Sequence, residues 1–393
     1  MMTMIDEFVT THALAGYRIR QFNTAFYQEF ISSFDALSTW PKELRETLKK
    51  EIPFSTLDAV REQHSRDGGT VKFLFRRTGD GKQFETVLMR HRDGRNTVCV
   101  SVMIGCPAGC AFCATGKMGF MGHLTAREIV DQVLHIARLL KNEQQTVTNI
   151  VFMGMGEPLL NLDAVKEALD IFTTPEKMGM SERRMTISTS GFTDRLKKLL
   201  ASGYTGRLAL SLHAPDQALR EQLMPIAKKY PLQELLDVCS AYAEESNKRV
   251  SYEYILIDGV NDTKECAEKL AKLMDPRLSH VNLIPYNPVA GVKFKRSSAA
   301  SIHAFADILK KHHIPHTIRV TMGDDIQAAC GQLACQISGV AGSGSARSLL
   351  FAIIWIMAHA PRAMARSSII RRKVFFANHS PAMINRIMKK SWT

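Results

Sequence analysis

Short apolar runs alternate with amphipathic segments along the chain from about Thr97 onward. Seven runs are rich in the β-branched and apolar residues that favour strands: TVCVSVMI (97–104), NIVFMGMG (149–156), RRMTISTSG (183–191), GRLALSLHA (206–214), VSYEYILID (250–258), HVNLIPYNP (280–288) and HTIRVTM (316–322). The segments between them space apolar residues as helices do: 125–142, 162–172, 192–203, 216–224, 231–247, 263–274 and 298–313. This alternation predicts an α/β fold with a parallel sheet, curled into a complete or partial (β/α) barrel.

One helix start is well defined by the sequence. Thr125 precedes the apolar positions of the first helical segment, and Glu128 follows three residues later, which is the capping-box pattern. The stretch CVSVMIGCPAGCAFCATGKMGF (99–120) therefore lies in the loop between the first strand and its helix. In parallel barrels this end of the sheet carries the active site.

The same patterns indicate the domain organisation. Residues 1–67 contain AGYRIRQFNTAFYQEFI and PKELRETLKKEI, which predict a small helical accessory domain. In residues 68–96, TVKFLFRR and FETVLMRHR flank the turn TGDGK, which predicts a β-hairpin. We expect residues 97–340 to form the core, and residues 341–393 to form a basic tail that is disordered or partly helical.

Charge is concentrated in that tail. The 393-residue chain has a formal net charge of +13, and residues 341–393 contain nine Lys or Arg residues and no Asp or Glu, which leaves about +4 for the rest. The global basicity is therefore only weak support for a nucleic-acid partner. The tail fits either an RNA-binding extension or a stretch without selected function.

Features of export are absent from the sequence. The beginning, MMTMIDEFVTTHALAGYRIRQ, has early acidic residues and no unbroken apolar stretch, unlike a secretory signal. The longest apolar run, LLFAIIWIMA from Leu349, is shorter than the roughly twenty residues of a membrane span. We therefore expect a cytoplasmic protein without a membrane span, whose cysteines are thiols or metal ligands.

Three cysteines in the 99–120 stretch have the spacing of a metal site. Cys106, Cys110 and Cys113 follow a C-x3-C-x2-C pattern, and the glycine and proline residues between them allow the sulfurs to converge. Structural zinc sites usually combine paired C-x2-C knuckles to supply four ligands. Three thiolates instead leave one iron of a 4Fe–4S cube without a protein ligand, and an open coordination position is typical of a catalytic site. The alternatives are ordinary core cysteines, or a zinc site completed by a histidine such as His123.

This spacing, with an aromatic residue (Phe112) before the last cysteine, resembles the radical S-adenosylmethionine (SAM) superfamily. The motifs GCPAGCAFCATGKMGF, FMGMGEPLLN, RRMTISTSG, LALSLHAP, VNLIPYNP and GDDIQAACGQL occur in the order and approximate spacing of the RlmN/Cfr family of RNA adenosine methyltransferases. The resemblance covers about residues 15–338. It implies a 4Fe–4S cluster on Cys106, Cys110 and Cys113, and two SAM molecules per turnover.

The resemblance also assigns three catalytic residues. Cys330 would accept a methyl group from one SAM, and a radical from the second SAM would convert it to a methylene group that joins the adenine. Cys99 would attack the sulfur and release the RNA through a transient disulfide, while Glu85 would accept the ring proton. From the residues alone, Cys99 is more typical of a buried core thiol and Glu85 of a solvated strand residue.

Seven residues near the carboxyl ends of predicted strands match cofactor-binding positions of the family. They are Gly156, Glu157, Ser188, Ser211, Leu212, His213 and Asn287. Serine and asparagine at strand ends also satisfy turn backbone, and His213 could be a structural hydrogen-bonding residue. This chain departs from the family at Met103, where a glutamine is common, and in its tail.

The family's substrates are RNA. Pro158 in MGEPLLN favours methylation of adenosine carbon 2 in 23S rRNA, and as a second substrate tRNA, over the carbon 8 chemistry of the Cfr branch. The resemblance implies an electron donor such as flavodoxin or ferredoxin, and we expect a monomer. The competing hypothesis is a non-catalytic iron–sulfur or zinc RNA-binding protein. Basic residues of the N-terminal region could contact phosphates, although a solvated helix face explains them equally: Arg18, Arg20, Lys42, Arg45, Lys49 and Lys50.

Overall fold

The computed structural model describes residues 4–334. The predicted tail at 341–393 and Cys335 lie outside the described residues. Within the described part, no helix is long and apolar enough to cross a membrane.

Ten strands form one mixed sheet in the order β1-β2-β3-β4-β7-β8-β9-β10-β11-β12. β1 to β4 pair antiparallel, and the strands from β4 to β12 pair parallel. Their bounds are β1 Leu57–His64, β2 Thr70–Arg77, β3 Gln83–Arg90, β4 Asn96–Cys99, β7 Asn149–Phe152, β8 Met185–Thr189, β9 Arg207–Ser211, β10 Val250–Leu256, β11 Ser279–Pro285 and β12 His316–Ile318. A separate antiparallel pair joins β5 (Met103–Gly105) to β6 (Phe120–His123).

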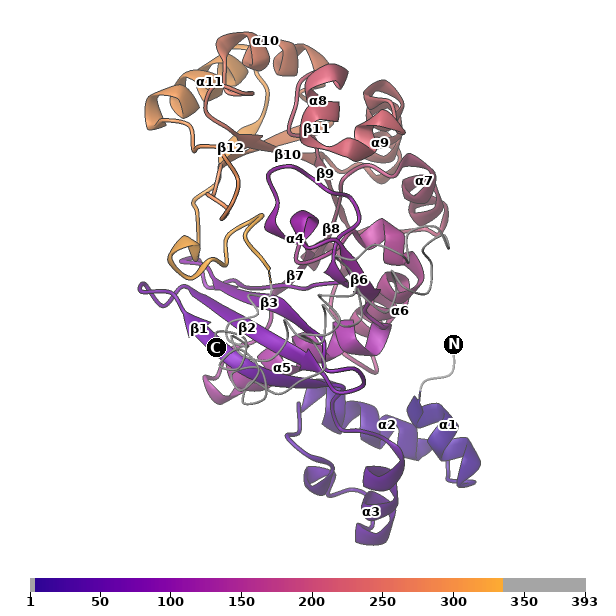
Figure 1. Cartoon of the computed structure of the whole chain (residues 1–393). Helices are drawn as coiled ribbons and strands as arrows, with labels where there is room; N and C mark the ends of the chain where they lie inside the picture. The colour runs from indigo at the N-terminus through magenta and orange to yellow at the C-terminus, as the bar shows by residue number, and fades with distance from the viewer. Residues whose placement is uncertain (1–3, 335–393) are drawn as a thin grey trace, which may run out of the picture. The chain divides into compact units, whose positions relative to one another are not determined.

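Helices connect the parallel strands and lie along the outer side of the sheet, while the short α4 lies on the inner side (Figure 1). The α-helices are α1 Met4–Thr11, α2 Tyr17–Asn23, α3 Lys42–Glu51, α4 Ala114–Lys117, α5 Ala126–Asn142, α6 Leu162–Thr173, α7 Thr193–Ala201, α8 Gln217–Leu223, α9 Leu232–Ser246, α10 Lys264–Leu273 and α11 Ala299–Lys311. A π-helical turn covers Thr24–Gln28, and short 3-10 helices cover Phe34–Ala36, Pro158–Asn161, Glu182–Arg184, Pro225–Lys228 and Asp324–Ile326.

The predicted alternation of strands and helices is confirmed. Each of the seven apolar runs contains one of the parallel strands, and each amphipathic segment contains one of the helices α5 to α11. The apolar positions of α5 face the core and are fully buried: Ile129, Val133, Ile136 and Leu140. Within residues 4–334, no pairing joins the edge strands β1 and β12, so the sheet has two open edges there.

The expectation of helix up to residue 67 is wrong for its last part. The helical region ends with α3, and residues 57–64 form β1, which pairs antiparallel with β2. Most of the β1 side chains are exposed, so the segment lacks the alternation of apolar and polar positions by which a half-buried strand is recognised. The predicted hairpin is β2 and β3, and it continues the main sheet through β4.

Aromatic and cationic side chains join the N-terminal helical region to α5. The guanidinium groups of Arg127 and Arg138 lie 4.9 Å and 5.3 Å from the ring centroid of Phe26. The Nε of Arg138 donates to the carbonyl oxygen of Ile31 at 2.9 Å. These contacts desolvate both cations against an aromatic face, an arrangement that strengthens cation–π attraction.

Some basic residues of the N-terminal region already have local partners. Lys49 pairs with Asp35 at 2.5 Å and Glu46 at 2.8 Å, and Arg45 donates to the carbonyl oxygen of Asp35. Arg18 donates to the carbonyl oxygen of Thr39 at 2.7 Å. These contacts favour a solvated helix face over a row of free phosphate ligands.

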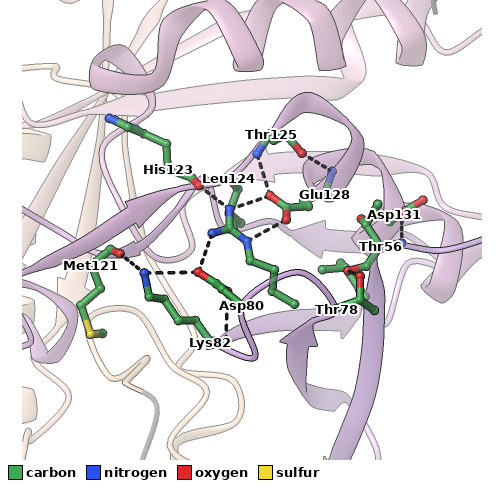
Figure 2. A network of polar contacts seen from close by, with 12 residues as sticks. Thr56, Thr78, Asp80, Lys82, Met121, His123, Leu124, Thr125, Glu128 and Asp131 are labelled. Atoms are coloured by element: carbon green, nitrogen blue, oxygen red, sulfur yellow. Dashed lines mark hydrogen bonds and ion pairs between the residues drawn. The ribbon is translucent and has the colours of Figure 1, made fainter. Parts of the chain in front are cut away.

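A polar network fastens the β2–β3 hairpin to the beginning of α5 (Figure 2). Arg77 contacts both carboxylate oxygens of Glu128, at 2.7 Å through Nε and 2.8 Å through Nη2, and also donates to the carbonyl oxygen of His123. In the hairpin turn, Lys82 donates to the carbonyl oxygen of Met121 at 3.0 Å. The network therefore joins the hairpin, β6 and α5 around the loop that carries the cysteine motif.

Glu128 also completes the predicted capping box, which is confirmed. Its backbone N–H donates to the Thr125 hydroxyl at 3.2 Å, and its carboxylate accepts from the Thr125 backbone N–H at 2.8 Å. Both otherwise unpaired donors at the beginning of α5 are thereby satisfied.

We predict that Thr125→Ala lowers the free energy of unfolding by about 1 kcal/mol, because the first turn of α5 loses its side-chain acceptor. Urea unfolding followed by circular dichroism measures the change. Thr125→Ser retains the hydroxyl and is the matched control. Equal unfolding midpoints for the alanine and serine variants would contradict the prediction.

Candidate active site

The cysteine motif occupies the connection between β5 and α4. Gly105 ends β5 with φ +72°, and a Cβ added there would lie 1.8 Å from the carbonyl oxygen of Gly119, so this turn requires glycine. The next backbone N–H, of Cys106, donates to the same Gly119 oxygen at 3.0 Å. At the other end, the N–H of Cys113 donates to the carbonyl oxygen of Cys110 at 3.2 Å. Backbone contacts thus hold the loop closed at both ends.

The thiols of this loop are poorly hydrated. Burial raises the pKa of Cys106 to about 12, and the charges of Glu157 and Cys113 add to the rise. Burial also raises the pKa of Cys110 well above its ordinary value, with the charges of Cys113 and Cys106 adding to it. All three cysteines are free. A bound cation would offset the cost of ionising neighbouring thiols, so this donor set suits a cationic metal centre.

A buried arginine beside the loop fits an anionic group. Arg220 on α8 is fully buried, and its Nη2 donates to the carbonyl oxygens of Ser190 at 2.6 Å and Ser211 at 3.3 Å. Its Nε and Nη1 have no hydrogen-bond partner among the described residues. Burial lowers the pKa of Arg220 to about 10, and the charge of Cys110 opposes this. A thiolate-bound iron–sulfur cluster, which is anionic, would compensate the buried cation.

Among residues 4–334, no three His, Cys, Asp or Glu side chains are placed to hold one metal ion. A 4Fe–4S cluster makes no such demand, because each thiolate binds a different iron of the cube.

Glu157 presents a buried carboxylate near the cysteine loop. Its Oε2 accepts from the backbone N–H and the hydroxyl of Ser190 at 2.8 Å and 2.7 Å, and its Oε1 accepts from the N–H of Leu159 at 3.1 Å. Burial raises the pKa of the Glu157 carboxyl, and these hydrogen bonds oppose the rise. Oε2 already accepts two hydrogen bonds, whereas Oε1 accepts one, so Oε1 is the oxygen that can accept from a ligand ammonium group.

Gly156 is required for packing inside the protein. Its φ is +100°, and an added Cβ would lie 2.5 Å from Cβ and 2.7 Å from Cγ of Met103. Met103, at the position where the chain departs from the family, is fully buried on β5. The backbone at Gly156 therefore approaches β5 closely, and Met103 packs against it.

The strand-end residues of β8 and β9 are fixed by pairing with neighbouring strands. Ser188 on β8 aligns with β9 in the parallel register, and Ser211 ends β9. After Ser211, the backbone N–H groups of Leu212 and His213 both donate to the carbonyl oxygen of Glu253 on β10, at 3.0 Å and 3.2 Å. The strand end is thus fixed by its neighbour.

His213 has structural contacts. Its Nδ1 accepts from the backbone N–H of Ile255 at 3.1 Å, and its ring lies edge-on to Phe112 with centroids 4.8 Å apart. Burial lowers the pKa of His213 to about 3, with Arg220 adding to the effect. The neutral imidazole therefore supports the cysteine loop through Phe112.

Hydrogen bonds dock the segment that bears Cys330 onto the cysteine motif. The N–H of Ala114 donates to the carbonyl oxygen of Gly331 at 2.8 Å, and the hydroxyl of Thr115 donates to that of Leu333 at 2.6 Å. Asn287, after β11, donates to the carbonyl oxygen of Cys330 at 3.2 Å. Cys330 is therefore held next to α4, although more than two hundred positions separate them in the sequence.

Cys99 and Cys330 influence one another electrostatically. Burial raises the pKa of Cys99 to about 12, and the charge of Cys330 adds to the rise. Cys330 is open to solvent on one side, yet desolvation by the surrounding protein raises its pKa too, and a hydrogen bond from Arg319 opposes that rise. Both thiols are free. The structure thus brings the two predicted reactive cysteines into one electrostatic environment.

Glu85 lies in the same region and is buried. Its Oε2 accepts from the backbone N–H of Ala334 at 2.9 Å, and its Oε1 lies 3.0 Å from the ammonium of Lys72. Burial raises the pKa of Glu85, and Lys72 is the main opposing charge. The expectation that the Glu85 side chain is exposed to solvent is wrong, because the segment after Cys330 covers this side chain.

Sequence reasoning missed three cations of this site: Lys72, Arg220 and Arg319. Lys72 and Arg220 occupy the polar positions of an alternating strand and an amphipathic helix, which ordinarily face solvent. Their burial depends on partners distant in the sequence. No local pattern marks them.

Comparison with known proteins agrees with this geometry. Residues 100–274 match the model of the radical SAM superfamily. The chain is 41% identical over 330 residues to the probable dual-specificity RNA methyltransferase RlmN 2 of Protochlamydia amoebophila, covering 84% of this chain and 92% of that protein. It is 44% identical over 318 residues to the probable dual-specificity RNA methyltransferase RlmN of Symbiobacterium thermophilum, covering 81% and 85%.

A solved structure shares the fold. The radical SAM methyltransferase from Sphaerobacter thermophilus superposes with a TM-score of 0.82 at 44% identity, covering 84% of this chain and 97% of that one. With its cysteine loop, its buried compensating charges and these matches, the chain belongs to the RlmN family of radical SAM methyltransferases.

Proposed function

We propose that the protein methylates carbon 2 of an adenosine in 23S rRNA, and also in tRNA, by way of a methylated Cys330 and a transient covalent protein–RNA bond. The observation that carries the proposal is the docking of the Cys330 segment on α4, directly after Cys113. Relatives named as probable dual-specificity RNA methyltransferases, of which this chain covers 92% and 85%, support an RNA substrate.

In this proposal Cys106, Cys110 and Cys113 hold a 4Fe–4S cluster. The cofactor-binding set for SAM is Gly156, Glu157, Ser188, Ser211, Leu212, His213 and Asn287. Glu157 accepts from the amino group of SAM, because its carboxylate is fixed by Ser190 and retains accepting capacity. When bound and reduced, the cluster and SAM supply a 5′-deoxyadenosyl radical, and a second SAM supplies the methyl group.

The residues of the chain then have three tasks. Cys330 carries the one-carbon group as a radical that adds to the adenine. The unpaired electron of this adduct would return to the cluster, and Glu85 accepts the proton from carbon 2, so that a closed-shell thioether joins Cys330 to the base. The Cys99 thiolate attacks the sulfur of Cys330, so the carbon–sulfur bond breaks and its electron pair passes to the carbon, which takes up a proton. The disulfide formed between Cys99 and Cys330 is reduced by a thiol before the next turnover.

The surroundings of the reaction follow from the same chemistry. A base stacked in a helix cannot reach Cys330, so the target adenosine must be unstacked on binding. A low-potential one-electron donor of the flavodoxin or ferredoxin class reduces the cluster. We propose that the protein works as a monomer in the cytoplasm.

Each cluster ligand is expected to be indispensable for iron binding. Replacing Cys106, Cys110 or Cys113 by alanine should abolish the iron content and the visible absorbance of anaerobically purified protein, because three thiolates are the minimum anchor. Cys266→Ala, on α10 outside the motif, is the control and should retain both. Full iron content in a motif variant would contradict the assignment.

The two reactive cysteines are expected to have opposite phenotypes. Under anaerobic turnover, Cys99→Ala should accumulate a covalent protein–RNA species on denaturing gels, because the bond to Cys330 forms but is not resolved. Cys330→Ala should form none, and neither variant should turn over. Mass spectrometry of nucleosides identifies the product of the wild type. Intact activity of Cys330→Ala, or 8-methyladenosine as the sole product, would refute the proposal.

Release of RNA is expected to accelerate with pH. The Cys99 pKa of about 12 leaves little thiolate at neutral pH, and the thiolate fraction rises about tenfold per pH unit below the pKa. Decay of the covalent species in a single turnover should therefore become up to about tenfold faster per unit between about pH 7 and 9. A pH-independent decay would show that Cys99 is not the attacking thiol.

A further inference from the structure

A buried ion pair joins the β2–β3 hairpin to the Cys330 segment. Lys72 on β2 and Glu85 on β3 are separated by 3.0 Å between Nζ and Oε1, and both side chains are 6% exposed. In the strand register Glu85 lies opposite Leu74, so Lys72 and Glu85 are diagonal neighbours on one face of the hairpin. The other face presents Phe73 and Phe75 to His135 of α5.

Each member of the pair holds one end of the segment. The Lys72 ammonium donates to the carbonyl oxygen of Gln327 at 3.2 Å, and the Glu85 carboxylate accepts from the N–H of Ala334 at 2.9 Å. Gln327 and Ala334 flank Cys330 by three and four residues. The hairpin therefore hydrogen-bonds to the chain on both sides of the reactive thiol of Cys330.

The charge of Lys72 has a second consequence. Glu85 is buried, and burial favours its neutral form, so its pKa lies above the ordinary value. The ammonium and the Ala334 N–H are among the groups that oppose this. Without Lys72 the pKa of Glu85 would rise further, so a larger fraction of Glu85 would be protonated. A protonated carboxyl cannot accept another proton.

We propose that Lys72 is a positioning residue of the methyl transfer: it fixes the Cys330 segment against the hairpin and keeps Glu85 in the carboxylate form that accepts the proton from the adenine. The inference rests on the proposed function, in which Glu85 is that acceptor.

The test compares three variants in single-turnover reactions with RNA. Lys72→Met removes the charge and keeps most of the side-chain volume, and Lys72→Arg keeps the charge. Arg76→Met is the matched control, because Arg76 lies on the same strand in an exposed ion pair with Asp58. The readouts are the methyl load of Cys330 by intact-protein mass spectrometry, the iron content, and the rate at which the covalent protein–RNA species decays.

Lys72→Met should load iron and methylate Cys330, because neither step needs Glu85 as a base. Its covalent species should decay more slowly than that of the wild type at pH 7, by up to about tenfold, since loss of the neighbouring ammonium raises the pKa of Glu85 further and lowers its carboxylate fraction. The ratio of variant to wild-type rates should rise towards one as the pH increases, because Glu85 regains its charge above its raised pKa. The contribution of Cys99 cancels in this ratio. Lys72→Arg and Arg76→Met should decay like the wild type.

A rate ratio that stays constant with pH, or a Lys72→Met variant with wild-type decay, would overturn the inference and leave the proposed function standing. If the wild type itself forms neither the covalent species nor methylated adenosine, the proposed function fails first. Should Lys72→Met fail to load iron, Lys72→Gln, which keeps a hydrogen-bond donor without the charge, carries the same prediction.

Discussion

The hydrogen bonds that dock the Cys330 segment determine the rest of the site. After β12 the described chain has only one short 3-10 helix, so no strand pairing places this segment. Its position depends on contacts from α4, from Asn287 and from the hairpin. The cysteine loop and Cys330 consequently form one unit in space, although they lie near opposite ends of the core in the sequence.

Burial of charge is the second constraint. Lys72, Arg220 and Arg319 are cations placed beside carboxylates or thiols, and burial alone would disfavour all of these ionised groups. Such clusters of perturbed groups are typical of reaction sites, because the protein maintains charges there that water would otherwise solvate. Arg220 is the clearest case, since two of its donors have no partner among the described residues.

The sequence predicted the parallel strands, the helices and the cap of α5, because these depend on local periodicity and local hydrogen bonds. The spacing of three cysteines was enough to predict a metal site in the loop after the first parallel strand. The sequence failed at β1, whose exposed side chains carry no strand pattern, and at Lys72 and Arg220, whose burial arises from distant partners. The packing of Gly156 against Met103 also lies beyond sequence patterns, because it joins two segments that are distant in the sequence.

The Lys72–Glu85 pair also limits how long the protonated state of Glu85 can last. Removing one charge from a buried pair leaves the other uncompensated, which is strongly unfavourable. A proton received from the adenine would neutralise Glu85 and leave the Lys72 ammonium as the uncompensated charge. The pair would be restored only when that proton passes on, so the same interaction that prepares the carboxylate as an acceptor also drives its return to the ionised form.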